Sequence, residues 1–105
     1  MVLCRIEFHF KNGECGLDVV FIQELPECVA SVGLEIGFDD LPHTIHGVVS
    51  RVNWWASSEA IELETLEVES NMDLDALGKS LLDDDRVVFV EYSRGDEGIW
   101  SETRG

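Results

Sequence analysis

Carboxylate side chains are the residues of this chain whose spacing could support a specific chemistry. Glu62 and Glu64 alternate along one predicted strand, so they share a face and repeat about every 6.6 Å, twice the strand rise of about 3.3 Å per residue. Glu67 and Glu69 repeat the interval further along. This interval is similar to the distance between successive phosphates of a nucleic-acid strand. The spacing therefore predicts a surface that imitates a nucleic-acid backbone.

A second group of carboxylates surrounds a predicted helix. Asp73 and Asp75 lie at its start, and Asp83, Asp84 and Asp85 follow its end. Negative charge at a helix C-terminus opposes the macrodipole by roughly 0.3–1 kcal/mol per residue, so a stabilising role is not predicted for the last three. The alternative is a solvated charge run. We predict a partner-binding surface with Trp55 as an aromatic anchor, made of Glu62, Glu64, Glu67, Glu69, Asp73, Asp75, Asp83, Asp84, Asp85 and Trp55.

The total charge indicates what kind of partner such a surface would bind. With 22 acidic and 7 basic side chains the formal charge is −15, well beyond the magnitude of roughly 2–8 that favours solubility. Residues 1–58 carry eight acidic and three basic side chains and residues 59–105 carry fourteen and four, which gives −5 and −10. This field repels nucleic acid and anionic membranes. We therefore expect a basic protein partner and no direct contact with nucleic acid or membrane.

Other kinds of functional site have weaker support. The histidines and cysteines lack the local signatures of nucleophilic catalysis. Cys4, Cys15 and Cys28 are interpreted as reduced core residues. His43 and His46 have an HxxH spacing without a recognisable third metal ligand, and no EF-hand or glycine-rich phosphate loop is present. We predict no enzyme activity, no metal site and no cofactor.

The clearest structural signal is an N-terminal hairpin. Asn12-Gly13 is a preferred pair for a type I′ turn, in which both central residues need φ > 0, and an alternating run flanks it on each side. Pairing outward from this turn places the apolar residues of both strands on one face and the charged residues on the other. The predicted pairs are Lys11 with Glu14, Phe10 with Cys15, Phe8 with Leu17, Ile6 with Val19 and Cys4 with Phe21.

Three further strands are predicted before the helix. Residues 31–38 alternate and favour a strand, although residues 26–32 could also form a short helix. After a turn at residues 39–42, residues 44–56 form a long strand in which Val48, Val52 and Trp54 share a face; without a bulge, Trp55 points the other way. Residues 60–69 form the next strand, and the changing phase of their apolar residues predicts a bulge near Thr65.

One helix and one strand complete the predicted elements. Asn71 or Asp73 caps a helix that ends near residue 82 and has a stripe of Leu74, Leu77 and Leu81. Residues 86–93 are apolar on both faces, which indicates a central strand. The Arg94-Gly95-Asp96 tripeptide and the tail after it are interpreted as turn-like, with Trp100 as the anchor.

These elements predict a single acidic α+β domain over residues 1–105. It has a mainly antiparallel β-sheet of five to six strands, including the N-terminal hairpin, with one short helix packed on it. No stretch approaches the roughly 20 apolar residues of a membrane span, and the first residues lack a secretory-signal pattern. We therefore expect a cytoplasmic protein; the oligomeric state stays open.

Size and charge also suggest a biological role. In these two respects the chain resembles phage-encoded DNA mimics such as anti-restriction and anti-CRISPR proteins, a resemblance of composition and not of any motif. It implies an inhibitor that blocks a basic nucleic-acid-binding surface of a target protein. Two alternatives are an immunity protein that neutralises a basic nuclease toxin and a salt-adapted acidic domain without a charge-directed partner.

Overall fold

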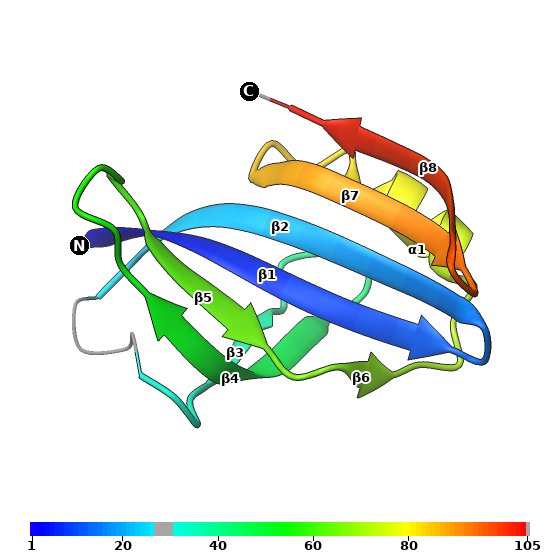
Figure 1. The fold of residues 1–105 in the computed structure, drawn as a ribbon, viewed down its shortest axis with the longest axis horizontal. Helices are drawn as coiled ribbons and strands as arrows, with labels where there is room; N and C mark the ends of the chain where they lie inside the picture. Colours follow the sequence, from blue (N-terminus) through cyan, green and yellow to red (C-terminus); the bar gives the residue numbers. More distant parts are fainter. Residues whose placement is uncertain (27–30, 105) are drawn as a thin grey trace.

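The computed structural model describes residues 1–26 and 31–104 and consists mostly of one curved β-sheet with one short helix (Figure 1). The sheet has eight strands in the order β3-β4-β5-β1-β2-β7-β8, with β6 also paired to β1. The predicted combination of sheet and helix is confirmed, but the predicted number of five to six strands was wrong. The elements are β1 (Val2–Asn12), β2 (Cys15–Leu25), β3 (Glu35–Phe38), β4 (Ile45–Asn53), β5 (Ile61–Thr65), β6 (Val68–Glu69), α1 (Leu74–Leu81), β7 (Val87–Arg94) and β8 (Glu97–Thr103).

β1 and β2 form the predicted hairpin with a different turn. Phe10 lies opposite Leu17, two residues beyond its predicted partner, because the turn residues are Gly13-Glu14 and not Asn12-Gly13. Gly13 has a φ of +59°, whereas no described non-glycine residue has a positive φ, which fits a type II′ turn with glycine first. A shift of two residues leaves each side chain on its own face. The predicted inner face of the hairpin, from Cys4 to Phe10 and from Leu17 to Phe21, is therefore buried as expected.

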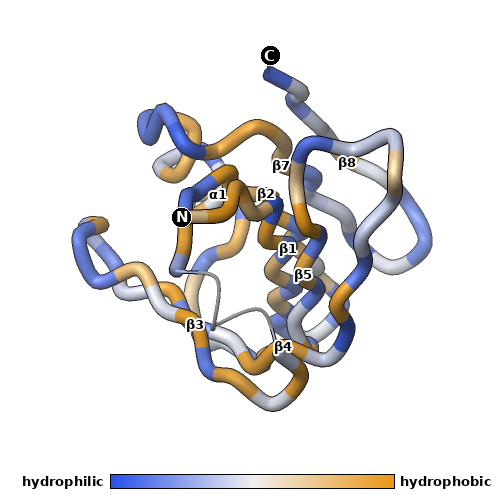
Figure 2. Tube along the Cα trace, turned by 90° about the vertical axis from the view of Figure 1, so that its left-hand side faces the viewer, coloured by the Kyte–Doolittle hydropathy of each residue, from blue (hydrophilic) through white to orange (hydrophobic). Residues whose placement is uncertain are grey.

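The sheet curls until β3 lies over β2. The rings of Phe38 in β3 and Phe21 in β2 stack with centroids 4.4 Å apart, although β4, β5 and β1 separate these strands within the sheet. Phe8 packs edge-on against both rings, at 5.6 and 6.0 Å. Figure 2 shows the alternation of hydrophobic and hydrophilic residues along β1 that a strand with one face in the core requires.

The helix α1 covers the inner face of β2 and β7 (Figure 1). As predicted, Leu74, Leu77 and Leu81 are its buried stripe, and the Asp73 carboxylate caps it by accepting hydrogen bonds from the backbone N–H groups of residues 75 and 76. Among the described residues, no helix is long and apolar enough to cross a membrane.

β5 and β6 run parallel to β1 and are separated by an irregularity. Glu64 lies opposite Glu7, and Val68 lies opposite Phe10, so the offset between partners rises from 57 to 58 residues. One extra residue is therefore inserted beside Leu66, which is exposed. This confirms the bulge predicted near Thr65. The parallel pairing itself was not predicted.

A second bulge, in β4, changes which of its side chains face the core. The pairing with β5 shifts between Val49 and Arg51. Val49 is buried and Val48 exposed before the bulge, whereas Val52 packs against the core after it. The prediction that Val48, Val52 and Trp54 share a face was therefore wrong, and Trp54 lies beyond the end of β4.

The strands at the two edges of the sheet also differ from the predictions. β3 begins only at Glu35, because a turn with Gly33 at a φ of +92° precedes it; the part of the predicted helix or strand at residues 27–30, including Cys28, lies outside the described residues. The tail after Gly95 is the strand β8 and not turn-like, which was a wrong prediction. Arg94-Gly95-Asp96 does lie at a turn, the one that joins β7 to β8.

Candidate functional site

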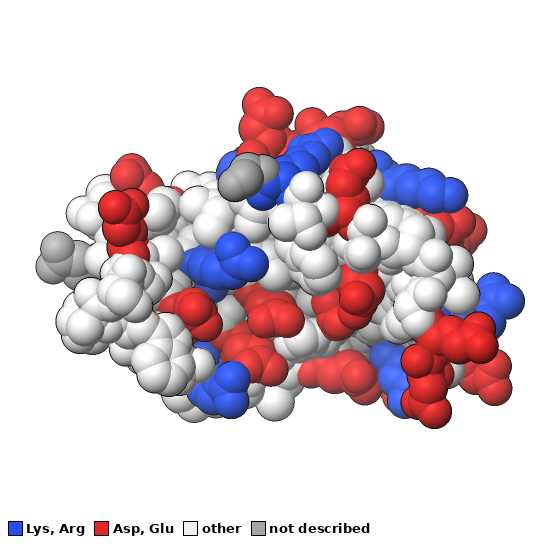
Figure 3. All heavy atoms as spheres, turned by 45° about the horizontal axis from the view of Figure 1, so that its top comes forward, with Lys and Arg blue, Asp and Glu red and all other residues white. Residues whose placement is uncertain are grey.

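The outer face of the sheet, opposite the core, carries most of the carboxylates of the strands β5, β1, β2 and β7. Strand partners share a face, so Glu62, Glu64 and Glu69 lie on the outer face with their β1 partners Arg5, Glu7 and Lys11. Figure 3 shows acidic side chains spread over the visible face of the molecule, with Lys and Arg side chains between them. We call the following residues the acidic face: Glu7, Asp18, Glu62, Glu64, Glu67, Glu69 and Glu91.

Like charges lie directly opposite each other at two places on the acidic face. Glu7 in β1 is the register partner of Glu64 in β5, and Asp18 in β2 is the partner of Glu91 in β7. Neighbouring strands are only about 4.8 Å apart, and opposed like charges destabilise a sheet. The fold therefore keeps these carboxylates together at a cost in stability.

His9 lies at the centre of the acidic face and contacts carboxylates from three strands. Its Nδ1 donates to Asp18 Oδ1 at 2.6 Å, and its Nε2 lies 3.4 Å from Glu64 Oε1 and 3.8 Å from Glu7 Oε1. The hydrogen bond to Asp18 raises the pKa of His9; burial acts against this, and the charges of all three carboxylates add to it. A protonated His9 therefore offsets part of the repulsion on this face.

No family model, curated protein or solved structure matched this chain in comparisons with known proteins.

Basic side chains on the outer face reduce its charge only in part. Arg51 Nη2 contacts Glu64 Oε2 at 3.1 Å, but the Arg51 side chain is 67% exposed. Exposed pairs of this kind contribute roughly 0–1 kcal/mol, so Glu64 holds Arg51 only weakly. Within residues 1–26 and 31–104, no ion pair involves Glu62, Glu67, Glu69 or Glu91.

The carboxylates around the helix are not part of the acidic face, and three of them have partners within the fold. Asp73 caps α1, and Asp75 accepts a hydrogen bond from Trp100 Nε1 at 2.6 Å and pairs with Lys79 at 3.2 Å. Asp84 binds Arg86. Asp83 and Asp85 are exposed in the loop between α1 and β7. The structure thus brings Glu62, Glu64, Glu67 and Glu69 together and leaves the helix-associated acids elsewhere.

Trp55 lies in the loop between β4 and β5 with its neighbour Trp54. Both indoles are strongly exposed, Trp54 at 65% and Trp55 at 60%. Asn53, directly before them, is the strand partner of Glu62. The predicted aromatic anchor therefore adjoins the acidic face, together with a second tryptophan that was not included in the prediction.

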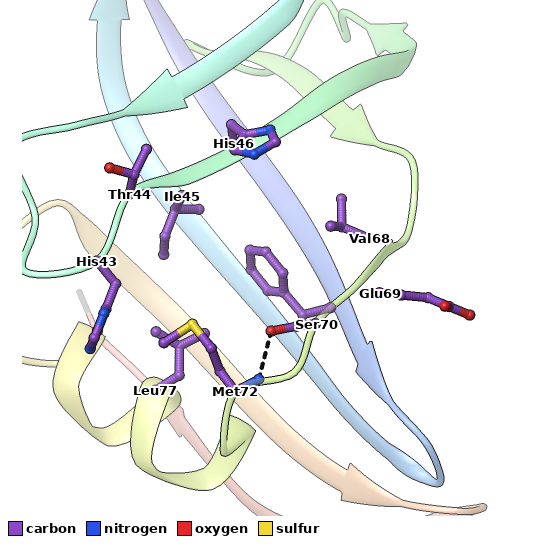
Figure 4. Close-up of a pocket in the computed structure, with 10 residues that line it drawn as sticks. His43, Thr44, Ile45, His46, Val68, Glu69, Ser70, Met72 and Leu77 are labelled. Atoms are coloured by element: carbon purple, nitrogen blue, oxygen red, sulfur yellow. Dashed lines mark hydrogen bonds between the residues drawn. The ribbon is translucent and has the colours of Figure 1, made fainter.

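A separate, mainly apolar pocket of about 180 Å³ lies between α1, β4 and β6 (Figure 4). His43, His46 and Glu69 are all on its rim, but Figure 4 shows the two imidazoles apart and Glu69 pointing away from both. Among the described residues, no group of three or more His, Cys, Asp or Glu side chains could hold a metal ion. The volume of this pocket is also below the roughly 300–1,000 Å³ of usual small-molecule sites.

The cysteines that the structure describes take part in packing. Cys4 is fully buried in the core, and burial raises the pKa of its thiol. Cys15 is partly buried, and its Sγ accepts a hydrogen bond from the Tyr92 hydroxyl at 3.3 Å.

Replacing His9 with Gln is expected to change how stability depends on pH. Because the folded-state pKa of His9 is raised above its ordinary value of 6.5, its stabilisation is fully present below about pH 6.5 and is lost as the pH rises through the folded pKa. H9Q should therefore lower the free energy of unfolding by about 1 kcal/mol at pH 6, and by less as the pH rises through the folded-state pKa of His9. Urea denaturation across this range measures the change. H46Q is the control, since His46 and its partner Glu35 are 58% and 69% exposed; equal pH profiles for H9Q and the unmodified protein would contradict the assignment.

Proposed function

We propose that the acidic face binds a basic, nucleic-acid-binding surface of another protein and blocks it, with carboxylates in the place of phosphates. The observation that supports this most directly is the pair of opposed like charges, Glu7 with Glu64 and Asp18 with Glu91. Such pairs weaken a fold but increase the attraction for a cationic partner. The alternation of Glu62 and Glu64 along β5 adds a repeat of about 6.6 Å in the same face. We further propose that this binding takes place in the cytoplasm.

Charge reversal within the acidic face is expected to slow association with the target. E67K/E69K should reduce the association rate about tenfold at low salt, because both side chains are exposed and steer the encounter electrostatically. D83K/D85K is a matched control, with the same change in net charge at two exposed positions outside the face. Surface plasmon resonance on the captured target gives both rates; equal effects of the two variants would indicate general charge attraction and contradict a specific face.

Identifying the target requires capture followed by a functional assay. The acidic protein is immobilised, and host proteins are passed over it at low and high salt. Each retained protein is then tested for nucleic-acid binding in the presence and in the absence of the acidic protein. We expect loss of nucleic-acid binding in the presence of the unmodified protein and retention of that binding in the presence of E67K/E69K. A retained protein that binds no nucleic acid would contradict the proposal.

The immunity-protein alternative uses the same face against a nuclease toxin. It is distinguished by the retained protein, which would then be a nuclease whose cleavage activity is inhibited. The salt-adapted alternative predicts unfolding in dilute buffer with recovery at molar salt, whereas a folded protein in dilute buffer excludes it.

A further inference from the structure

The backbone of the loop between β4 and β5 is fixed by hydrogen bonds at and directly after its two tryptophans. The backbone N–H of Ser58 donates to the Trp55 carbonyl at 2.8 Å, which closes a turn over residues 55–58. The Ser58 hydroxyl also donates to the Ala60 carbonyl at 3.0 Å and accepts from the Ala60 N–H at 3.2 Å. Preorganised groups lose less entropy on binding, so this loop is well suited to contact a partner.

The exposed indoles have no role in the core that would explain them. Neither Trp54 nor Trp55 belongs to the hydrophobic core or packs against it, whereas Trp100, the third tryptophan, does. Tryptophan is one of the side chains that most often dominates a protein interface. Trp54 and Trp55 therefore form an aromatic surface that lacks a partner within the described part of the chain.

Carboxylates lie beside the end of β4 from which this aromatic loop begins. Glu62 is the strand partner of Asn53, which directly precedes Trp54, and a small surface hollow is lined by Asn53, Glu62 and Glu64 together with Glu7. Arg5 and Arg51 also line this hollow and reduce its charge. Indole rings beside carboxylates are a combination that attracts cations through both the ring face and the charge.

Within the fold, one guanidinium of this chain already lies between an aromatic ring and carboxylates. The Cζ of Arg86 lies 4.9 Å from the centroid of the Phe38 ring. Its nitrogens contact Asp84 at 2.8 Å and Asp40 at 3.0 Å. A planar guanidinium can stack on a ring while it donates two parallel hydrogen bonds to a carboxylate, and an ammonium group cannot do both.

We propose that Trp54, Trp55 and the adjoining carboxylates form one site that selects arginine over lysine, so that the partner of the acidic face binds through arginine side chains. This inference rests on the proposed function, because it specifies the chemistry of the same partner. Trp54 and Trp55 supply the stacking surfaces, and Glu62 and Glu64 accept the hydrogen bonds.

Poly-arginine and poly-lysine peptides of equal length test this inference by isothermal titration calorimetry. The unmodified protein is expected to bind the arginine peptide about threefold to tenfold more tightly. W54A/W55A should lose this preference while its affinity for the lysine peptide changes less than about twofold. I99A is the control, since Ile99 is 50% exposed on the distant strand β8. Circular dichroism confirms that each variant is folded.

The outcomes separate the two proposals. Equal affinity for both peptides, or an arginine preference that persists in W54A/W55A, overturns the arginine inference alone, provided that E67K/E69K still weakens binding of both peptides. Binding that E67K/E69K does not weaken, or no binding of either peptide at low salt, overturns the acidic face as a binding surface and the arginine inference with it.

Discussion

Replacing Arg86 with alanine is expected to lower the free energy of unfolding by about 2–3 kcal/mol. The guanidinium donates to Asp84 from Nε at 3.0 Å and from Nη2 at 2.8 Å, and these two side chains are only 27% and 18% exposed. Arg86 also covers Phe38 and pairs with Asp40 in the loop before β4, so it connects the start of β7 to the end of β3. In R86A the mostly buried Asp84 carboxylate would lose its charged partner and keep only the backbone N–H of residue 86 as a donor, in addition to the lost stacking.

Guanidinium-chloride denaturation of R86A, R86K and R51A measures this effect. R86K keeps the charge but not the paired donors, so it should be intermediate. R51A removes an exposed pair and should change stability by less than about 0.5 kcal/mol. Arg86 lowers the pKa of Asp84 and Asp40 through its hydrogen bonds, so the contribution of these pairs is lost as the pH falls through those lowered pKa values. Equal stability of R86A and R51A would contradict the structural role.

Gly47→Val is expected to destabilise the protein by about 3 kcal/mol, the upper end of the usual range for overpacking. A Cβ atom at Gly47 would lie 2.9 Å from Thr65 Cβ and 3.2 Å from Phe8 Cδ1. Both neighbours are buried, and the Thr65 hydroxyl donates to the Glu7 carbonyl at 3.0 Å, so neither can move away easily. The added methyl groups would therefore displace β4 from the point where β5 ends.

Gly98→Val provides the matched control for this prediction. Gly98 also lies in a strand, but nothing is within 4 Å of a Cβ atom built there. Its replacement should change stability by less than about 0.5 kcal/mol in thermal or urea denaturation. Similar losses for the two variants would show that strand glycines are generally required and would exclude close packing as the cause.

Local patterns in the sequence predicted the elements whose residues interact with residues close to them in the chain. The alternation around Gly13 gave the correct faces of the hairpin, and the stripe of Leu74, Leu77 and Leu81 gave the helix. β8 was missed because Trp100 is its one partly buried residue and all its other residues are exposed, so it lacks the alternation of a half-buried strand. The hairpin register was wrong because Asn12-Gly13 and Gly13-Glu14 are both compatible with a tight turn.

The acidic face was predicted only where its residues are close in sequence. Glu62, Glu64, Glu67 and Glu69 were found from their spacing, but Glu7, Asp18 and Glu91 were not included. These three lie in separate strands and become neighbours only through strand pairing, in particular the unpredicted parallel pairing of β1 with β5. His9 was missed as the centre of the cluster for the same reason. An alternating strand sequence shows which face a residue occupies, but not which strand lies beside it.

The parallel pairing of β1 with β5 has a consequence for the order in which the protein can fold. β1 meets β2 across a tight turn, but its other neighbour is 57 residues away in the chain. Closing that loop costs entropy before any contact is gained, so the hairpin can form early whereas the β1–β5 contact must form late. That late step also brings Glu64 beside Glu7, which adds electrostatic repulsion to the barrier. We therefore expect the charge arrangement proposed for binding to slow this later step of folding as well, and dissolved salt should relieve the delay by screening the charges.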